Sequence, residues 1–332
     1  MTSGDAAEDI QTVSGCRLCP RNCGIDRAAS LGVCAVPDRL KVARAALHFW
    51  EEPCISGDEG SGAVFFSGCA LHCVYCQNRD ISGGKSGLLI SADRLADIFF
   101  ELKSQNACNI NLVTGDHYIP LIAQAIDKAV SRGFDLPFIF NCSGYEKPES
   151  LKMLDGLIDV YLPDFKYMDP ALAGRYSGAD DYPDVAKAAL DEMVRQCPGC
   201  IFDGRGMIKS GVIVRHLLLP GHVSDSKRIL GYLHERYKDS IYISIMSQYT
   251  PMEGITDSCP ELQRRVKRSE YDRLTDYAIA LGIENAYIQD MSVATESFIP
   301  AFDNEGVEAG ESVGTESMGV NGDGSNGVKL RF

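Results

Sequence analysis

The sequence lacks any segment typical of export or of membrane insertion. Its first ten residues, Met1–Ile10, are acidic and polar, without the basic start and apolar stretch of a secretory signal. No run of eighteen apolar residues occurs, so no membrane-spanning helix is predicted. We therefore expect a cytoplasmic protein with no membrane partner.

Basic charge is also scarce. The chain has 32 Lys and Arg against 46 Asp and Glu, a formal net charge of −14. An excess of acid disfavours binding to a phosphate backbone, so nucleic acid is not expected as a partner. The 332 residues are 45% hydrophobic, which is enough for a large core and one main domain.

Cysteine, in contrast, is abundant. The chain has thirteen cysteines, an odd and clustered set. A reducing compartment keeps thiols free, and clustered cysteines there indicate metal binding or catalysis rather than disulfides.

Composition divides the chain into four parts. Residues 1–15 are predicted to form a disordered leader, and residues 16–57 a cysteine-rich N-terminal element. Residues 58–300 are predicted to form the core domain. Residues 301–332 are predicted to be a disordered acidic and Gly-rich tail, because 304–327 contain seven glycines and little to bury.

Within the core, short apolar runs alternate with amphipathic segments. The predicted strands lie near Ala63–Ser67, Asn109–Val113, Pro137–Asn141, Val160–Asp164, Val212–Leu219 and Ile241–Met246. The predicted helices lie near Ser91–Asn106, Ile119–Arg132, Glu149–Leu154, Asp184–Gln196, Ser226–Tyr237 and Ser269–Gly282. Strict alternation predicts a parallel sheet with right-handed crossovers. We expect an α/β fold, a partial (β/α)6 TIM-like barrel with a small N-terminal cysteine-rich extension and functional residues at the carboxyl ends of its strands.

A three-cysteine motif, Cys69-Ala-Leu-His-Cys73-Val-Tyr-Cys76, directly follows the first predicted strand of this core. Three thiolates can hold three corners of a [4Fe-4S] cluster and leave the fourth iron open to a ligand such as the amine and carboxylate of S-adenosylmethionine (SAM). Zinc is the alternative, although zinc usually takes four ligands from two short knuckles. His72 is awkwardly placed within the loop to be the fourth.

The stretch around this motif, Ser67–Asn78, resembles the radical SAM superfamily. More narrowly, the chain resembles proteins similar to the pyruvate formate-lyase activating enzyme. The matching phrases are Cys16–Gly24, Glu51–Gly57, Asn111–Thr114, Ser143–Glu146, Tyr161–Tyr167, Arg215–Gly221 and Gln248–Pro251.

This resemblance implies an oxidoreductase that cleaves SAM reductively to a 5′-deoxyadenosyl radical and abstracts a hydrogen atom. It also implies a reductant such as flavodoxin or ferredoxin, and a glycyl radical enzyme as a candidate protein substrate. Modification of a small molecule or of another macromolecule is the alternative.

The resemblance also implies residues that bind SAM. Tyr75 and Gln77 would contact the adenine and its ribose, with a buried core aromatic as the alternative for Tyr75. Gly115 would let the backbone approach the ligand, and Asp116 would meet the SAM amine. A plain turn with Asp116 as a helix cap is the alternative.

Further candidates end the later strands. Asn141 and Ser143 lie at the end of the third predicted strand, and Asp164 and Lys166 at the end of the fourth. The Asp-x-Lys pattern resembles the activating enzymes, in which such residues line the SAM and substrate cavity; a structural salt bridge is the alternative. Arg215, on the fifth strand, would bind the SAM carboxylate or a partner's backbone, because its planar fork suits oxyanions.

The N-terminal element supplies four more thiols, from Cys16, Cys19, Cys23 and Cys34, within nineteen residues. So short a segment cannot build a core, so a metal is predicted to supply its folding free energy. Zinc and a second iron–sulfur cluster both suit four thiolates, and four free cysteines packed on the barrel are the alternative. For the whole chain, a zinc-binding interaction protein without SAM chemistry is the alternative from another class.

Overall fold

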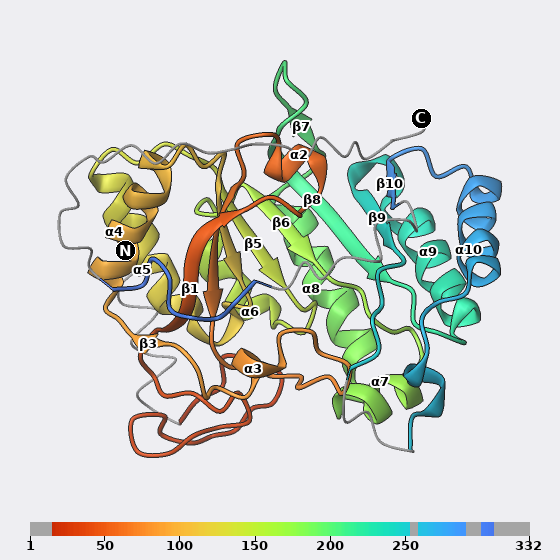
Figure 1. Ribbon diagram of the computed structural model, residues 1–332, viewed down its shortest axis with the longest axis horizontal. Helices are drawn as coiled ribbons and strands as arrows, with labels where there is room; N and C mark the ends of the chain where they lie inside the picture. Colours follow the sequence, from red (N-terminus) through yellow and green to blue (C-terminus); the bar gives the residue numbers. More distant parts are fainter. Residues whose placement is uncertain (1–14, 253–257, 290–299, 309–332) are drawn as a thin grey trace.

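One large sheet lies at the centre of the protein (Figure 1), in a computed structural model that describes residues 15–252, 258–289 and 300–308. Its strands are β1 (Lys41–His48), β2 (Ser61–Phe66), β3 (Leu88–Leu89), β4 (Ile110–Val113), β5 (Phe138–Cys142), β6 (Val160–Pro163), β7 (Ile201–Phe202), β8 (Ile208–Leu217), β9 (Tyr242–Met246) and β10 (Ala286–Ile288). The spatial order is β10-β9-β8-β6-β5-β4-β2-β1-β3, with β7 beside β8. Neighbouring strands from β2 to β10 along this order are parallel, whereas β1, β3 and β7 pair antiparallel.

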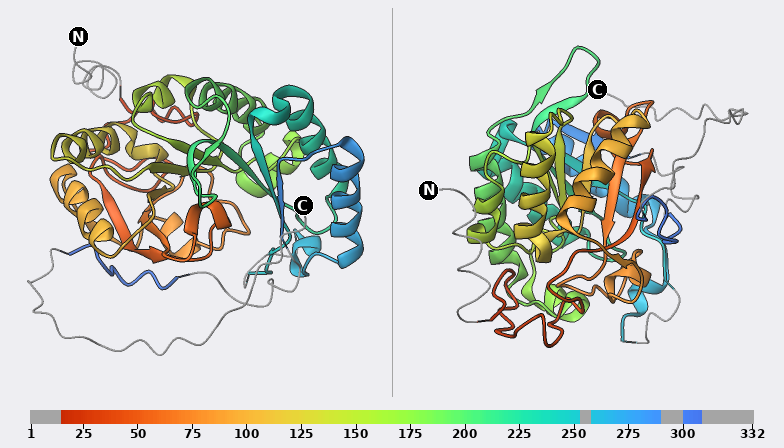
Figure 2. Two further views of the ribbon diagram at one scale, coloured as in Figure 1. Left: turned by 90° about the horizontal axis from the view of Figure 1, so that it is seen from above. Right: turned by 90° about the vertical axis from the view of Figure 1, so that its left-hand side faces the viewer.

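Helices cover the outer side of this curved sheet (Figure 2). The α-helices are α2 (Pro53–Ser56), α3 (Arg79–Ser82), α4 (Ala92–Ser104), α5 (Ile119–Ser131), α6 (Pro148–Leu151), α7 (Pro170–Ser177), α8 (Tyr182–Gln196), α9 (Val223–Tyr237) and α10 (Arg268–Leu281). Six strand–helix units, followed by β10, form a partial TIM-like barrel. The fold predicted from the sequence is therefore confirmed.

Local sequence explains these elements, as α4 illustrates. The Ser91 side chain accepts a hydrogen bond from the Arg94 amide and so caps the first turn. Leu95, Phe99 and Leu102 then recur at helical spacing and are buried against the sheet.

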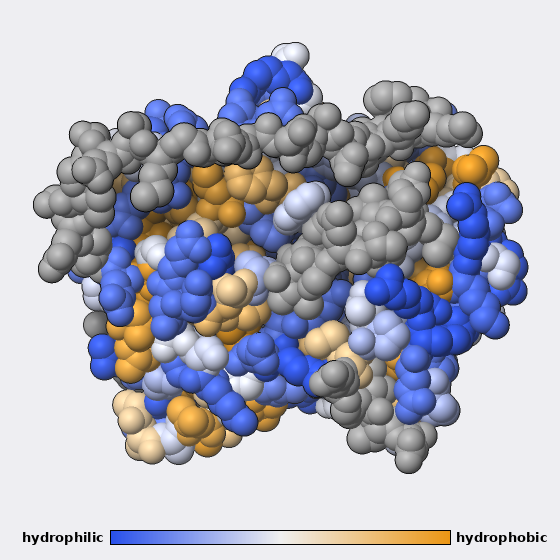
Figure 3. Space-filling view, viewed as in Figure 1, coloured by the Kyte–Doolittle hydropathy of each residue, from blue (hydrophilic) through white to orange (hydrophobic). Residues whose placement is uncertain are grey.

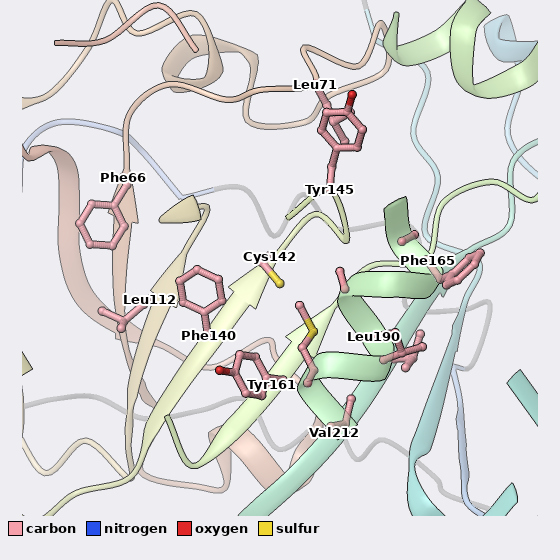
Figure 4. Close-up of a cluster of buried hydrophobic side chains, with 14 of the residues drawn as sticks. Phe66, Leu71, Leu112, Phe140, Cys142, Tyr145, Tyr161, Phe165, Leu190 and Val212 are labelled. Atoms are coloured by element: carbon pink, nitrogen blue, oxygen red, sulfur yellow. The ribbon is translucent and has the colours of Figure 1, made fainter. Parts of the chain in front are cut away.

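Both faces of the central strands are buried, as expected for parallel strands. On the outer face, Phe66, Leu112, Phe140 and Tyr161 of successive strands form a row in one hydrophobic cluster, and Leu190 of α8 belongs to the same cluster (Figure 4). On the inner face, Ile139, Leu162 and Ile213 form a second cluster with Ile55 of α2. The short helix α2 therefore fills the barrel interior at the amino ends of the strands.

The sheet extends further toward the N-terminus than predicted. Residues 41–48, which composition assigned to the cysteine-rich element, form β1 and pair with β2. The element that precedes the barrel therefore ends before β1.

The start of the predicted tail also differs from the prediction. Within residues 300–308, the Asn304 amide donates to the Ala43 carbonyl (3.0 Å), and the Ala45 amide donates to the Glu305 carbonyl (2.8 Å). Val307 is only 1% exposed. A few apolar residues in an acidic, Gly-rich stretch are enough to attach it to β1, and average composition hides them. The predicted disorder of residues 1–14 and 309–332 lies outside the described residues.

The surface agrees with the acidic composition. In Figure 3, hydrophilic residues are distributed over the visible face, and hydrophobic residues form separate patches between them. Among the helices that the structure describes, none is long and apolar enough to cross a membrane.

Candidate active site

A cavity of about 260 Å³ opens at the carboxyl ends of the parallel strands, at the opposite end of the barrel from α2. Among its lining residues are Cys69, Cys73, Tyr75, Cys76, Gln77, Asn141, Ser143, Asp164, Lys166 and Arg215. These ten residues follow or end four different strands, and the parallel topology brings them to one place.

The inner face of each strand changes character toward this cavity. On β5, buried Ile139 is followed two positions later by Asn141, and on β8 Ile213 is followed by Arg215. Alternate residues share one face of a strand, so the inner face of each strand carries a core residue and, two positions later, a polar residue of the cavity. The inner face is therefore apolar in the middle of each strand and polar at its carboxyl end, where the cavity lies.

The three cysteines lie on the loop that follows β2. Burial, helped by Asp116 and by the other two thiols, raises the pKa of Cys69 far above its ordinary value. Burial and the neighbouring Cys73 raise the pKa of Cys76 to about 11. The protein alone thus disfavours the thiolate forms of Cys69 and Cys76, and a bound cationic core would reverse this. The donor set, three converging thiols on one cavity, fits a [4Fe-4S] cluster with an open iron.

Glycine is required in this loop at Gly68. Its φ is +91°, and a Cβ there would lie 2.6 Å from the Cys34 carbonyl oxygen. At this point the cluster loop and the N-terminal element therefore lie too close together for a side chain between them.

A partly buried ionic network forms another part of the cavity wall. The Arg215 guanidinium donates from Nε to Asp164 (3.0 Å), from Nη1 to Glu51 (3.2 Å) and from Nη2 to Asn141 (2.6 Å). Lys166 Nζ contacts the other Asp164 oxygen at 2.6 Å. Burial raises the pKa of Asp164, but the adjacent Lys166 and Arg215 outweigh it and leave that pKa below its ordinary value. The predicted Asp-x-Lys pair is thus an ion pair that also faces the cavity.

Glu51 is the residue of this network that sequence reasoning did not assign to the site. Its carboxylate accepts from Asn111 (2.9 Å) and Asn141 (3.3 Å) as well as from Arg215. It reaches the cavity from the loop after β1, and its neighbour Trp50 also lines the wall. The only signal for Glu51 in the sequence is that it begins the segment Glu51–Gly57, which resembles the activating-enzyme-like proteins but carries no predicted function.

Tyr75 lines the cavity and is also part of an aromatic core. It is 8% exposed and packs edge-on against Tyr167, Tyr176 and Tyr249, with ring centroids 6.2–6.5 Å apart. Tyr75 is therefore a core aromatic that also reaches the cavity, and its contact with SAM stays a prediction. Gln77 faces the same cavity.

The structure does not bring Gly115 and Asp116 to the cavity, although Thr114 does line it. A Cβ on Gly115 would lie 2.5 Å from Ile122 Cδ1, so this glycine serves the packing of α5. Asp116 begins a short 3-10 helix (Asp116–Tyr118) and is 2% exposed. Its carboxylate interacts with both Cys19 and Cys69, so it lies between the two cysteine groups.

The N-terminal element packs beside the cluster loop. Cys19 and Cys34 are buried, and burial raises the pKa of both thiols, to about 12 for Cys19. Arg21 donates to the carbonyls of Ala70 (2.8 Å) and Ser177 (2.9 Å). In the described part of the chain, no three or more His, Cys, Asp or Glu side chains are grouped so that they could hold a single metal ion. All thirteen cysteines are described, and none of them forms a disulfide.

Comparison with known families identifies the cysteine loop. Residues 56–177 match the family model of a 4Fe-4S single cluster domain, and this stretch contains Cys69, Cys73 and Cys76. The match confirms the predicted iron–sulfur domain.

Individual proteins resemble this chain at low sequence identity. An uncharacterized protein of Methanocaldococcus jannaschii is 26% identical over 286 residues, which are 82% of this chain and 76% of that protein. Streptococcus suis SuiB bound to S-adenosylmethionine aligns with a TM-score of 0.44 and 11% identity, over 67% of this chain and 48% of that one. SuiB bound to its precursor peptide SuiA aligns with a TM-score of 0.42 and 12% identity, over 67% and 46%. This chain thus matches about half the length of SuiB. The substrate and partners of this chain are therefore treated under the proposed function.

Proposed function

We propose that this protein is a radical SAM enzyme whose [4Fe-4S] cluster is held by Cys69, Cys73 and Cys76. With SAM bound, such a cluster supplies one electron to the sulfonium, which yields methionine and a 5′-deoxyadenosyl radical that abstracts a hydrogen atom. The observation that carries the proposal is that the three cysteines share one cavity with seven of the nine residues predicted to bind SAM.

The ionic network suits the polar end of SAM. Each Nη atom of Arg215 carries two protons, and its contacts with Glu51 and Asn141 use one each. The second protons are those that would bind a carboxylate, while Asp164 and Glu51 hold the guanidinium plane in place. Burial of the site would strengthen these contacts and exclude water from a radical.

For the substrate, we propose a protein, and specifically a glycyl radical enzyme, with flavodoxin or ferredoxin as the reductant. This assignment rests on the resemblance to activating enzymes at residues such as Asp164 and Lys166. Transfer of deuterium from a glycine-labelled protein into 5′-deoxyadenosine would support it. Transfer from a small molecule or from another macromolecule would replace it with the alternative substrate class.

For the N-terminal element, we propose a second metal site, zinc or iron–sulfur, formed by Cys16, Cys19, Cys23 and Cys34. Charge interactions of Cys19 with Cys16 and Cys34 support the closeness of these three thiols. The lack of disulfides among the thirteen described cysteines also supports a reducing location such as the cytoplasm.

The ligand assignment is tested with a cysteine variant and a matched control. Cys73→Ala should fold but retain little iron after anaerobic reconstitution, and should form no 5′-deoxyadenosine when reduced with SAM. Cys108→Ala is the control, because Cys108 is a half-buried thiol outside the cavity and should keep wild-type iron and activity. Full activity in Cys73→Ala would reject the ligand set.

A further inference from the structure

Three hydroxyl groups form a continuous hydrogen-bonded chain that ends on a cysteine of the cavity. The Tyr75 and Tyr167 hydroxyls are 2.7 Å apart, and the Tyr167 hydroxyl lies 2.7 Å from Ser177 Oγ. Ser177 Oγ in turn donates to Cys73 Sγ at 3.0 Å. Tyr75, Tyr167 and Ser177 are 8%, 1% and 3% exposed, so water has little access to the chain.

The direction of these hydrogen bonds follows from the state of Cys73. A thiolate ligand has no proton, so Cys73 Sγ can only accept. Ser177 has one proton and gives it to the sulfur, so Tyr167 must donate to Ser177 Oγ, and Tyr75 must donate to Tyr167. All three dipoles then point toward the sulfur, and each hydrogen bond strengthens the next.

The protein holds Ser177 firmly in this position. Ser177 is the last residue of α7, and the Val74 amide of the cluster loop donates to the carbonyl of its neighbour Tyr176 (2.8 Å). Arg21 of the N-terminal element donates to the Ser177 carbonyl on one side and to the Ala70 carbonyl of the cluster loop on the other. The distance between Ser177 and Cys73 is therefore fixed from two directions.

We propose that this hydroxyl chain raises the reduction potential of the cluster, an inference that rests on the proposed function. Reduction adds negative charge to the cluster and to its thiolates. A hydrogen bond donated to a ligand sulfur stabilises the reduced form more than the oxidised form. Ser177 and Tyr167 thus act through Cys73 and make the electron transfer that precedes SAM cleavage easier.

The test is an EPR-monitored redox titration of the reconstituted protein without SAM. Ser177→Ala should shift the equilibrium about tenfold toward the oxidised cluster, which for one electron is a potential about 59 mV lower. Tyr167→Phe should shift it in the same direction by less, and Ser177→Thr, which keeps the hydroxyl, should restore the wild-type value. Ser226→Ala is the matched control, because Ser226 is equally buried and its hydroxyl donates only to the His222 carbonyl (3.1 Å).

The outcomes separate this inference from the proposed function. A full cluster with unchanged potential in Ser177→Ala overturns the hydroxyl chain but leaves the radical SAM assignment intact. If Ser177→Ala fails to hold a cluster, the potential of Tyr167→Phe decides, and a wild-type value there overturns the inference. A wild-type protein that takes up no iron–sulfur cluster overturns both.

Discussion

The Glu51 carboxylate should be among the most important polar groups for stability, although it lies in a loop. It accepts three hydrogen bonds, from Asn111, Asn141 and Arg215, and its side chain is only 10% exposed. A hydrogen bond to a charged group contributes about 1.5–3 kcal/mol, and loss of one partner of a buried ion pair costs about 3–5 kcal/mol. Because Asp164 still pairs with Arg215 in the variant, we expect Glu51→Gln to destabilise the protein by about 2–3 kcal/mol.

The assay is urea unfolding at pH 7, followed by far-UV circular dichroism, with two control variants. Glu59→Gln removes a carboxylate that pairs with Arg205 on the surface, and its midpoint should hardly change. Glu52→Gln removes the adjacent buried carboxyl, whose pKa is raised by burial and whose Oε2 has no hydrogen-bond partner. The neutral amide should be tolerated better there than at Glu51.

The order of the urea midpoints of these three variants is the decisive result. We expect Glu51→Gln to be the least stable of the three, and its weakened hold on Arg215 should also lower the affinity for SAM. Equal midpoints for Glu51→Gln and Glu59→Gln would refute the role given to the network.

Two further predictions concern the N-terminal element and the helix α10. Cys19→Ala should lower the metal content of the N-terminal element without removing the cluster, as measured by zinc, iron and sulfide analysis; unchanged metal content would eliminate that site. Glu270→Gln should destabilise the protein at pH 7, because the contact with Arg264 lowers the pKa of Glu270 to about 2 from an ordinary 4.5. Since the folded pKa is depressed, this stability is fully present above pH 4.5 and is lost as pH falls toward 2. With solvent screening we expect about 1–2 kcal/mol at pH 7 from urea midpoints, and a loss that does not shrink in acid would contradict the assignment.

Much of the fold could be predicted because parallel strands buried on both faces read as apolar runs between amphipathic helices. All six predicted strands and six predicted helices are present. The strand β1 was missed because it pairs antiparallel with β2, and its mixed residues Lys41–His48 follow a cysteine-rich stretch. The strand β10 has three half-buried residues and no comparable pattern.

The candidate site shows the same division between local and long-range information. Cysteine spacing and polar residues at strand ends located most of the cavity, since parallel topology brings strand ends together. Glu51 could not be placed, because its position depends on how β1 pairs. Asp116 was expected at the ligand but is buried outside the cavity, near both the N-terminal cysteines and the cluster loop. These positions depend on tertiary packing, which spacing does not encode.

The most direct measurement is anaerobic reconstitution with iron and sulfide, reduction with dithionite in the presence of SAM, and assay of 5′-deoxyadenosine. We predict that it forms, and that its formation depends on Cys69, Cys73 and Cys76. A protein that takes up only zinc and leaves SAM intact would contradict the radical SAM assignment and favour a zinc-binding interaction protein.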